Sequence, residues 1–345
     1  MARGAGQRGQ VTEEMQRNRR RIYELVPQMQ FYHRLLHTQV WQPFVMRGCM
    51  PHIVRDELHT DQWGLRRTVG REGRNFTVES VSRDEPVDIV TGSSFAFGVG
   101  ASNDAATLSS RLAEATGRAT VQLAGHQHGL AQNFIQFMFF AGRYGAIRNI
   151  VLAGFVELFH FHTCPTLFRQ FGTFSNSQQF MVALNGEMKG KAARALYGAE
   201  KRAFATLSHV PERQEAERAL LRESIRNVMT TWCRFADAIG ARLTVVMQPT
   251  PELQERARSP EEAELLGNYD AISGMREVMD RCLRDHRDWH GADMAELAGE
   301  LGFTWLDLNA VLNRRFDGEW LHVDPVHMVD QGYRRAAELI LPALV

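Results

Sequence analysis

The sequence predicts a three-layer α/β domain over residues 86–345, in which a doubly wound, mostly parallel sheet of five strands carries helices on both faces. Two observations predict it. Short β-branched runs alternate with helical stretches from residue 86 onward, and parallel strands need such crossovers because the chain must return to the same end of the sheet. With 345 residues, of which 44% are hydrophobic, the chain can also bury a sizeable core.

Residues 1–85 are expected to form an extension in front of this domain. Residues 1–10 are rich in glycine and arginine, so we expect them to be disordered. Apolar spacing over residues 11–37 predicts an amphipathic helix, kinked or split at Pro27 because proline lacks a backbone donor. Residues 40–85 show no clear periodicity, which indicates an irregular lead-in packed on the main domain.

The elements of the main domain follow in order. Strands are expected at residues 87–91, 119–124, 147–155, 242–247 and 303–308. Helices are expected at residues 103–115, 130–144 and 331–341, with a mainly helical insertion over about 174–240. In doubly wound sheets ligands bind outside the carboxyl ends of the strands, where the strand order reverses.

Charge and cysteine content exclude several classes of protein. Lys plus Arg and Asp plus Glu both number 40, so no overall field favours nucleic acid or an anionic membrane, and neither partner is expected. The four cysteines are scattered without a Cys-x-x-Cys pair, which favours a reducing compartment over a disulfide framework or a zinc ribbon. Without an apolar leader or spanning run, the default expectation is a soluble cytoplasmic protein. The oligomeric state cannot be predicted.

Two serines stand where the first strand gives way to a helix. Ser93 and Ser94 follow the strand at the end of the sheet where such folds carry their chemistry. A serine hydroxyl is a poor nucleophile unless a base accepts its proton and a third group orients the base. Asp324 and His327 provide that pair in the last strand-to-helix connection, HVDPVHMVDQGY.

The Asp-x-x-His spacing is weak evidence alone, because a second copy occurs at Asp56 and His59 in the lead-in. The copy that ends at His327 is favoured by its position, since it follows the fifth strand and precedes a helix that can lie beside the Ser94 loop.

Together these blocks resemble the SGNH hydrolases, also called GDSL-like lipases and esterases, over roughly residues 60–345. In this chain, the segment GSSFAFG (residues 92–98) resembles the nucleophile block of the family. Ser94 matches the nucleophile and Ser93 matches the variable middle position. Asp324 and His327, followed by Gly332 and Tyr333, resemble the last block of the family, in which Asp-x-x-His precedes a small helix that opens with Gly-Tyr. The segment TDQWGLRR is similar to the lead-in of many bacterial members.

The resemblance implies a flavodoxin-like sheet, no organic cofactor and a Ser94–His327–Asp324 triad. It also implies an ester or thioester substrate, for which we favour a small acylated metabolite or glycan of bacterial secondary metabolism over bulk lipid. Hydrolysis and acyl transfer both remain open. The proposed activity is thus that of a serine-dependent esterase or acyltransferase.

The middle blocks depart from the family. Family members complete the oxyanion hole with a glycine amide and an asparagine side chain beside the nucleophile amide of Ser94. Gly125, or Ala124 without an alignment gap, matches the glycine, but Val156 stands at the asparagine position, followed by Glu157. Valine donates no hydrogen bond, and loss of one such donor costs roughly 100- to 1,000-fold in turnover.

The loops that carry these altered blocks each hold a His-x-His pair. The four histidines, expected near Ser94 together with Glu157, are His126, His128, His160 and His162. On an extended segment both rings of a pair point the same way, so they could bind a divalent metal, donate to an oxyanion, or simply line a pocket or the core. No metal is expected by default. Phe95 and the neighbouring phenylalanine-rich segments serve either the core or a substrate wall.

Two alternatives to the serine enzyme remain open. The fold could serve a binding or scaffold protein whose catalysis was lost through Val156, or a metal-assisted enzyme could use the two His-x-His pairs.

Overall fold

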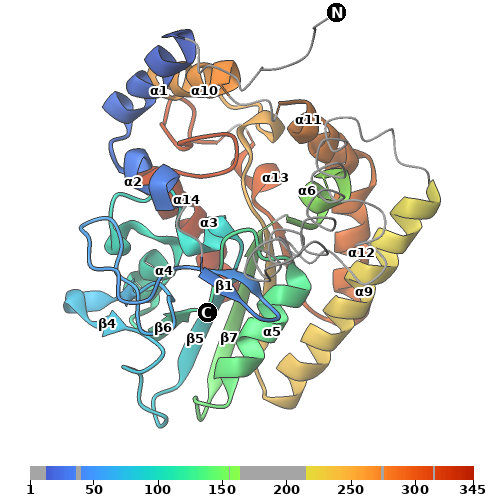
Figure 1. The fold of residues 1–345 in the computed structure, drawn as a ribbon. Helices are drawn as coiled ribbons and strands as arrows, with labels where there is room; N and C mark the ends of the chain where they lie inside the picture. The colour runs from blue at the N-terminus through green and yellow to red at the C-terminus, as the bar shows by residue number, and fades with distance from the viewer. Residues whose placement is uncertain (1–12, 36–39, 155, 164–214, 273–275, 314) are drawn as a thin grey trace, which may run out of the picture.

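The structure, a computed structural model, describes all residues except 1–12, 36–39, 155, 164–214, 273–275 and 314. The described strands of the main domain form one parallel sheet in the order β6-β5-β7-β8-β9 (Figure 1). Their bounds are Val87–Gly92 (β5), Ala119–Gln122 (β6), Ile147–Gly154 (β7), Arg242–Met247 (β8) and Thr304–Asp307 (β9). The predicted five-stranded, doubly wound sheet is confirmed. Its strand order reverses at β5, beside β7.

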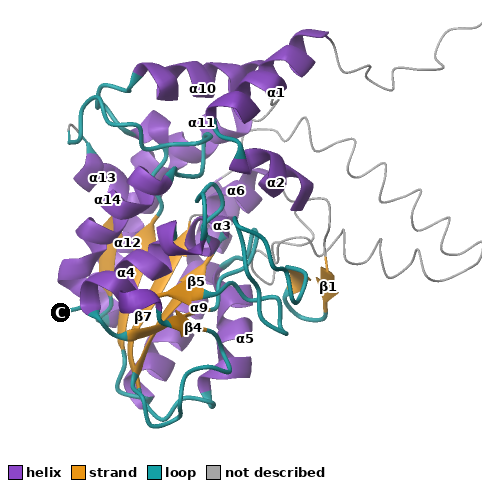
Figure 2. Ribbon diagram, turned by 90° about the vertical axis from the view of Figure 1, so that its left-hand side faces the viewer, coloured by secondary structure: helices purple, strands orange, loops and turns teal. Residues whose placement is uncertain are grey.

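Helices cover both faces of this sheet (Figure 2). Successive residues of a strand point to opposite faces, and the core divides accordingly: Ile89 and Leu152 enter one hydrophobic cluster, while Val90 and Val151 enter the other. The first cluster packs α5 (Leu130–Ala141), α9 (Glu215–Ala238) and α12 (Gly291–Leu301) on the sheet. The second packs α3 (Ser94–Phe97), α4 (Leu108–Thr116), α13 (Leu308–Leu312) and α14 (Asp330–Ile340). The three-layer prediction is therefore confirmed.

The amino-terminal residues join the second cluster. Pro27 splits the expected helix into α1 (Glu13–Leu25) and α2 (Gln28–Leu35), and α1 lies along α10 (Pro260–Ile272) at the top of Figure 1. The lead-in is more regular than expected, since it contains two small antiparallel pairs. These are β1 (Val40–Gln42) with β2 (Met46–Gly48), and β3 (Thr68–Val69) with β4 (Asn75–Phe76). Strands of two or three residues are too short to show periodicity in a sequence.

The remaining helices lie near the carboxyl ends of β7 and β9. They are α6 (Val156–Thr163), α11 (Arg276–Asp285) and a π-helical turn at His286–His290. Most of the predicted insertion lies outside the described residues; its described end belongs to α9. None of the helices in the described part of the chain combines the length and apolar character that crossing a bilayer requires.

Candidate active site

Ser94 stands on a sharp turn at the carboxyl end of β5. Gly92 ends the strand with φ at 141°, and a Cβ added there would lie 1.9 Å from the carbonyl oxygen of Ala153 on β7. Only glycine fits this close approach of two backbones. The turn delivers Ser94 as the first residue of α3, which ends at Gly98 in the left-handed conformation.

The structure brings Ser94, His327 and Asp324 together across more than 200 residues of chain. The Oγ atom of Ser94 lies 2.7 Å from Nε2 of His327. The Nδ1 atom of His327 lies 2.7 Å from Oδ2 of Asp324. Because a carboxylate can only accept, Nδ1 carries the proton in this network and Nε2 accepts from the Ser94 hydroxyl.

The carboxylate of Asp324 is held in its ionised form. Its Oδ1 atom accepts backbone N–H groups of Val326 and His327, both at 2.8 Å. Burial alone would raise the pKa of Asp324, but the adjacent His327 and the hydrogen bonds that the carboxylate accepts together lower it. This arrangement fixes the imidazole in one orientation, with Nε2 facing the serine.

Direct bonds hold the Ser94 loop to the segment that carries His327. The Tyr333 hydroxyl donates to the Val99 carbonyl at 2.7 Å. The carboxylate of Asp330 accepts the Ser102 amide at 2.7 Å and the Ser102 hydroxyl at 2.6 Å. Tyr333 also stacks on Phe95, which is fully buried, so Phe95 belongs to the core rather than to a substrate wall.

The amino-terminal extension secures the same loop from the other side. Tyr32 donates to the carbonyls of Gly98 and Ala101 at 3.2 and 2.8 Å. Gln28 donates to the carbonyl of Gly100 at 3.0 Å, and the buried guanidinium of Arg66 donates to the Gly98 carbonyl at 2.9 Å. The extension thereby satisfies the carbonyls of the turn after the serine.

The second Asp-x-x-His copy has a structural role. His59 lies 2.8 Å from Asp104 rather than pairing with Asp56, which is exposed. Asp104 is buried and also binds Arg66 at 2.9 Å and Arg67 at 3.0 Å. This cluster anchors the extension to the main domain.

Ser93 is not an alternative nucleophile. Its hydroxyl is buried and donates to Oε1 of Gln248 at 3.0 Å, while Nε2 of Gln248 donates to the Val326 carbonyl at 2.8 Å. The amide of Asn309 donates in turn to the Gln248 carbonyl at 3.0 Å. Gln248 and Asn309 tie β5, β8, β9 and the Asp324 segment together. Neither Gln248 nor Asn309 was predicted from the sequence, although each follows the carboxyl end of a strand.

The predicted oxyanion groups are only partly in place. The Gly125 amide already donates to the Gly92 carbonyl at 3.1 Å, which contradicts its expected role as a free donor. The reason is that Leu123 and Gly125 continue the pairing with β5 beyond the end of β6, and Ala124 lies buried between them. Val156 begins α6, and its side chain lies outside the described residues.

The two His-x-His pairs do not share one geometry. His160 and His162 lie on the helix α6, where residues two apart face different directions, so the expected extended pair is wrong there. His162 lies 2.8 Å from Asp285, and His128 lies 2.6 Å from the Arg47 carbonyl oxygen. Among the residues that the structure describes, no group of three or more His, Cys, Asp or Glu is arranged to hold a metal ion.

His126 differs from the other three histidines. It is buried, and neither ring nitrogen has a hydrogen-bond partner among the described residues. Its ring lies 4.4 Å from that of Phe97, one turn beyond Ser94 on α3. Burial, followed by the charge of Arg47, holds the pKa of His126 well below its usual range, so this imidazole is neutral.

Glu157 anchors the end of the same loop. Its buried carboxylate accepts the Leu130 amide at the start of α5, at 2.5 Å. Burial raises the pKa of Glu157 to about 7, although this hydrogen bond opposes the shift. Glu157 therefore joins the start of α6 to the amino end of α5.

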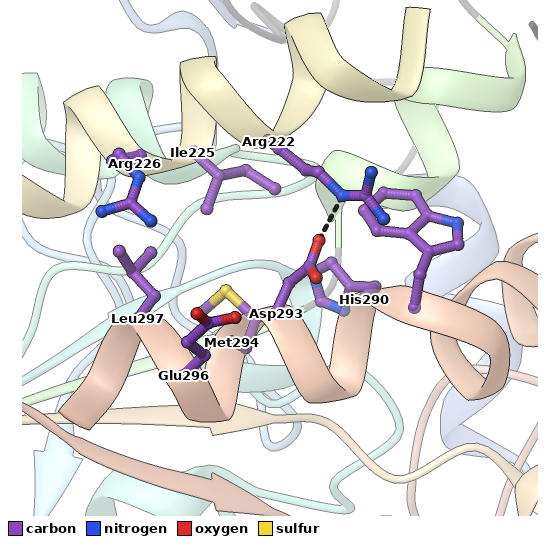
Figure 3. A pocket seen from close by; sticks show the side chains of 9 residues that line it. Arg222, Ile225, Arg226, His290, Asp293, Met294, Glu296 and Leu297 are labelled. Carbon is purple, nitrogen blue, oxygen red and sulfur yellow. Dashed lines mark hydrogen bonds and ion pairs between the residues drawn. The ribbon is translucent and has the colours of Figure 1, made fainter. Parts of the chain in front are cut away.

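A groove lies between α9 and α12 (Figure 3). It is lined by Arg222, Ile225, Arg226, Trp289, His290, Asp293, Met294, Glu296 and Leu297. Its charges are largely compensated, since Arg222 binds Asp293 and Arg226 binds Glu300. None of the three residues at the Ser94 site lines it.

No family model matches the chain, and no curated protein is similar to it. Among solved structures, one match is described as "a putative SGNH hydrolase from Slackia heliotrinireducens". It is 13% identical over 76% of this chain and 100% of that chain, with a TM-score of 0.39. A similarity this distant carries no weight for function, which must be argued from the geometry around Ser94.

Proposed function

We propose that the protein is a serine-dependent esterase or acyltransferase of SGNH type. A single observation carries the proposal: the Ser94 hydroxyl, the His327 imidazole and the Asp324 carboxylate lie in one chain of 2.7 Å hydrogen bonds. Such a chain supplies a nucleophile, a base and an orienting group. The bonds from Tyr32, Arg66, Asp330 and Tyr333 around it restrain the geometry on which such chemistry depends.

In the proposed reaction, Nε2 of His327 takes the proton of Ser94 as Oγ attacks the carbonyl carbon of the substrate. The carbonyl oxygen becomes an oxyanion, towards which the Ser94 amide can donate as the first N–H of α3. His327 then protonates the departing alcohol or thiol, which leaves an acyl group on Ser94. Water or another acceptor, deprotonated by His327, releases the acyl group and restores the serine.

The proposed substrate is an ester or thioester of a small acylated metabolite or glycan. The chain itself supplies every proton transfer and the nucleophile, so the mechanism needs no organic cofactor. Hydrolysis and transfer differ only in the acceptor of the acyl group.

A fluorophosphonate probe tests the proposal, because it labels only an activated serine. We expect the purified full chain to be labelled, and Ser94→Ala to abolish labelling. The matched control is Ser93→Ala, which removes the neighbouring hydroxyl that Gln248 binds and should leave labelling largely intact. Labelling that persists in Ser94→Ala would overturn the assignment. Absence of labelling in the wild type at any pH would favour a binding or scaffold protein.

A further inference from the structure

His126 presents a physical anomaly. Buried polar groups are almost always hydrogen-bonded, since an unpaired one loses the bonds it made to water. Within the part of the chain that the structure describes, both nitrogens of this buried imidazole nevertheless lack a partner. Its neighbour His128, equally buried, has Nε2 bound to the Arg47 carbonyl. A group that destabilises the fold in this way requires another reason for its presence.

Two contacts place His126 near the loop that carries Ser94. The preceding residue, Gly125, is bonded to Gly92, two residues before the serine. The His126 ring contacts the ring of Phe97 on α3.

The imidazole is suited to donate rather than to exchange protons. Held neutral, it carries one N–H donor and one acceptor nitrogen and takes no charge near neutral pH. A neutral imidazole that polarises a carbonyl is a known catalytic device. The site also lacks one expected donor, because the Gly125 amide is already engaged.

We propose that His126 is a catalytic residue that donates a ring N–H to the carbonyl oxygen of the substrate as that oxygen becomes negative. It thereby completes the oxyanion hole that Ser94 begins. This inference rests on the proposed serine mechanism. It also accounts for the unpaired ring N–H, because the partner of this donor is the substrate itself.

Two substitutions separate this role from a structural one. His126→Leu removes the donor at similar volume, and we expect the rate of fluorophosphonate labelling to fall about 100- to 1,000-fold. Its melting temperature should stay unchanged or rise, because an unsatisfied polar group has been removed. His126→Gln retains an N–H donor and should restore labelling at least tenfold over His126→Leu.

The control is His128→Leu, which removes the bond between the buried His128 ring and the Arg47 carbonyl. It should lower the melting temperature and change the labelling rate much less than His126→Leu. Labelling of His126→Leu at the wild-type rate would overturn the inference, as would a loss of stability as large as that of the control. If Ser94 of His126→Leu is labelled at the wild-type rate, only the role of His126 is overturned and the serine mechanism still stands. If the wild type is never labelled, the serine mechanism itself fails.

Discussion

Two loops meet at the carboxyl end of the sheet, and they differ in how their polar groups are satisfied. In the nucleophile loop, residues 92–101, the carbonyls of Val99, Gly100 and Ala101 each accept a side-chain donor from elsewhere in the chain. In the loop that follows β6, residues 124–129, both nitrogens of His126 and Nδ1 of His128 have no partner in the described ranges of the chain.

This difference in hydrogen bonding indicates that the first loop positions the nucleophile, whereas the second loop can bind the substrate. A loop whose groups are all satisfied internally has one stable arrangement and can hold Ser94 at a fixed distance from its base. A loop with buried unpaired groups has interactions left to make, and a substrate can make them. Substitutions in the first loop should therefore cost stability and geometry, whereas replacement of the unpaired His126 in the second should affect mainly the reaction.

The largest effect is expected at the orienting carboxylate. Asp324→Asn should lower the labelling rate about 10,000-fold, because an amide that donates to Nδ1 favours the wrong tautomer of His327. The backbone amides of Val326 and His327 can still bind its carbonyl oxygen, so folding should persist. Asp56→Asn, in the second Asp-x-x-His copy, is the control and should label normally. A loss below tenfold for Asp324→Asn would contradict the role of this pair.

The support of the nucleophile loop is tested at Arg66. Arg66→Met should lower the free energy of unfolding by about 3–5 kcal/mol, because it removes the fully buried partner of Asp104 and two donors to loop carbonyls. Urea denaturation measures the change. Arg67→Met removes a more exposed partner of the same carboxylate and should cost clearly less. Equal costs for the two variants would show that the loop does not depend on Arg66.

The anchor of the second loop should be sensitive to pH. In the folded state the pKa of Glu157 is about 7, against 4.5 for an unperturbed glutamate. Between these values the folded protein binds more protons than the unfolded one, so stability falls as pH rises through this window. The loss should reach roughly 3 kcal/mol above pH 7.

Glu157→Gln keeps an acceptor for the Leu130 amide and cannot ionise. Urea denaturation at pH 5 and pH 8 should show a smaller decrease for this variant than for the wild type. Identical decreases would assign the pH dependence to other groups.

The smallest effect is expected at Tyr32. Tyr32→Phe removes one hydroxyl that donates to the Gly98 and Ala101 carbonyls and accepts from Arg66. The free energy of unfolding should fall by about 1–2 kcal/mol, as measured in urea. Tyr23→Phe, whose hydroxyl is bonded to the partly buried His33, should cost less. If Tyr32→Phe leaves the free energy of unfolding unchanged, the hydrogen bonds to the nucleophile loop do not stabilise it as the comparison of the two loops requires.

The sheet was predictable because each strand is a short apolar run between turn residues. The strand Arg242–Met247 matches its predicted range, and the closing helix begins one residue earlier than expected. The meeting of Ser94 with His327 was also expected, since both segments lie at the carboxyl ends of strands.

Other features depend on contacts that spacing does not encode. His59 stands three residues after Asp56, yet its partner is Asp104, 45 residues away. The Gly125 amide looked free because the continued pairing with β5 extends beyond the apolar run of β6. The pair of His160 and His162 was assigned to an extended segment, but a helix begins at Val156. The orphaned state of His126 could not be predicted either, because burial of a loop side chain depends on tertiary packing.

The bonds from Gln28, Tyr32 and Arg66 also determine how far the chain can be shortened. A fragment that starts at β5 would contain every strand of the five-stranded sheet and all three residues of the proposed triad. Such a fragment would lack the donors that cover Gly98, Gly100 and Ala101. The loop that carries its serine would then be less restrained. Low activity of such a fragment would therefore report the loss of these hydrogen bonds and not the chemistry of the intact protein.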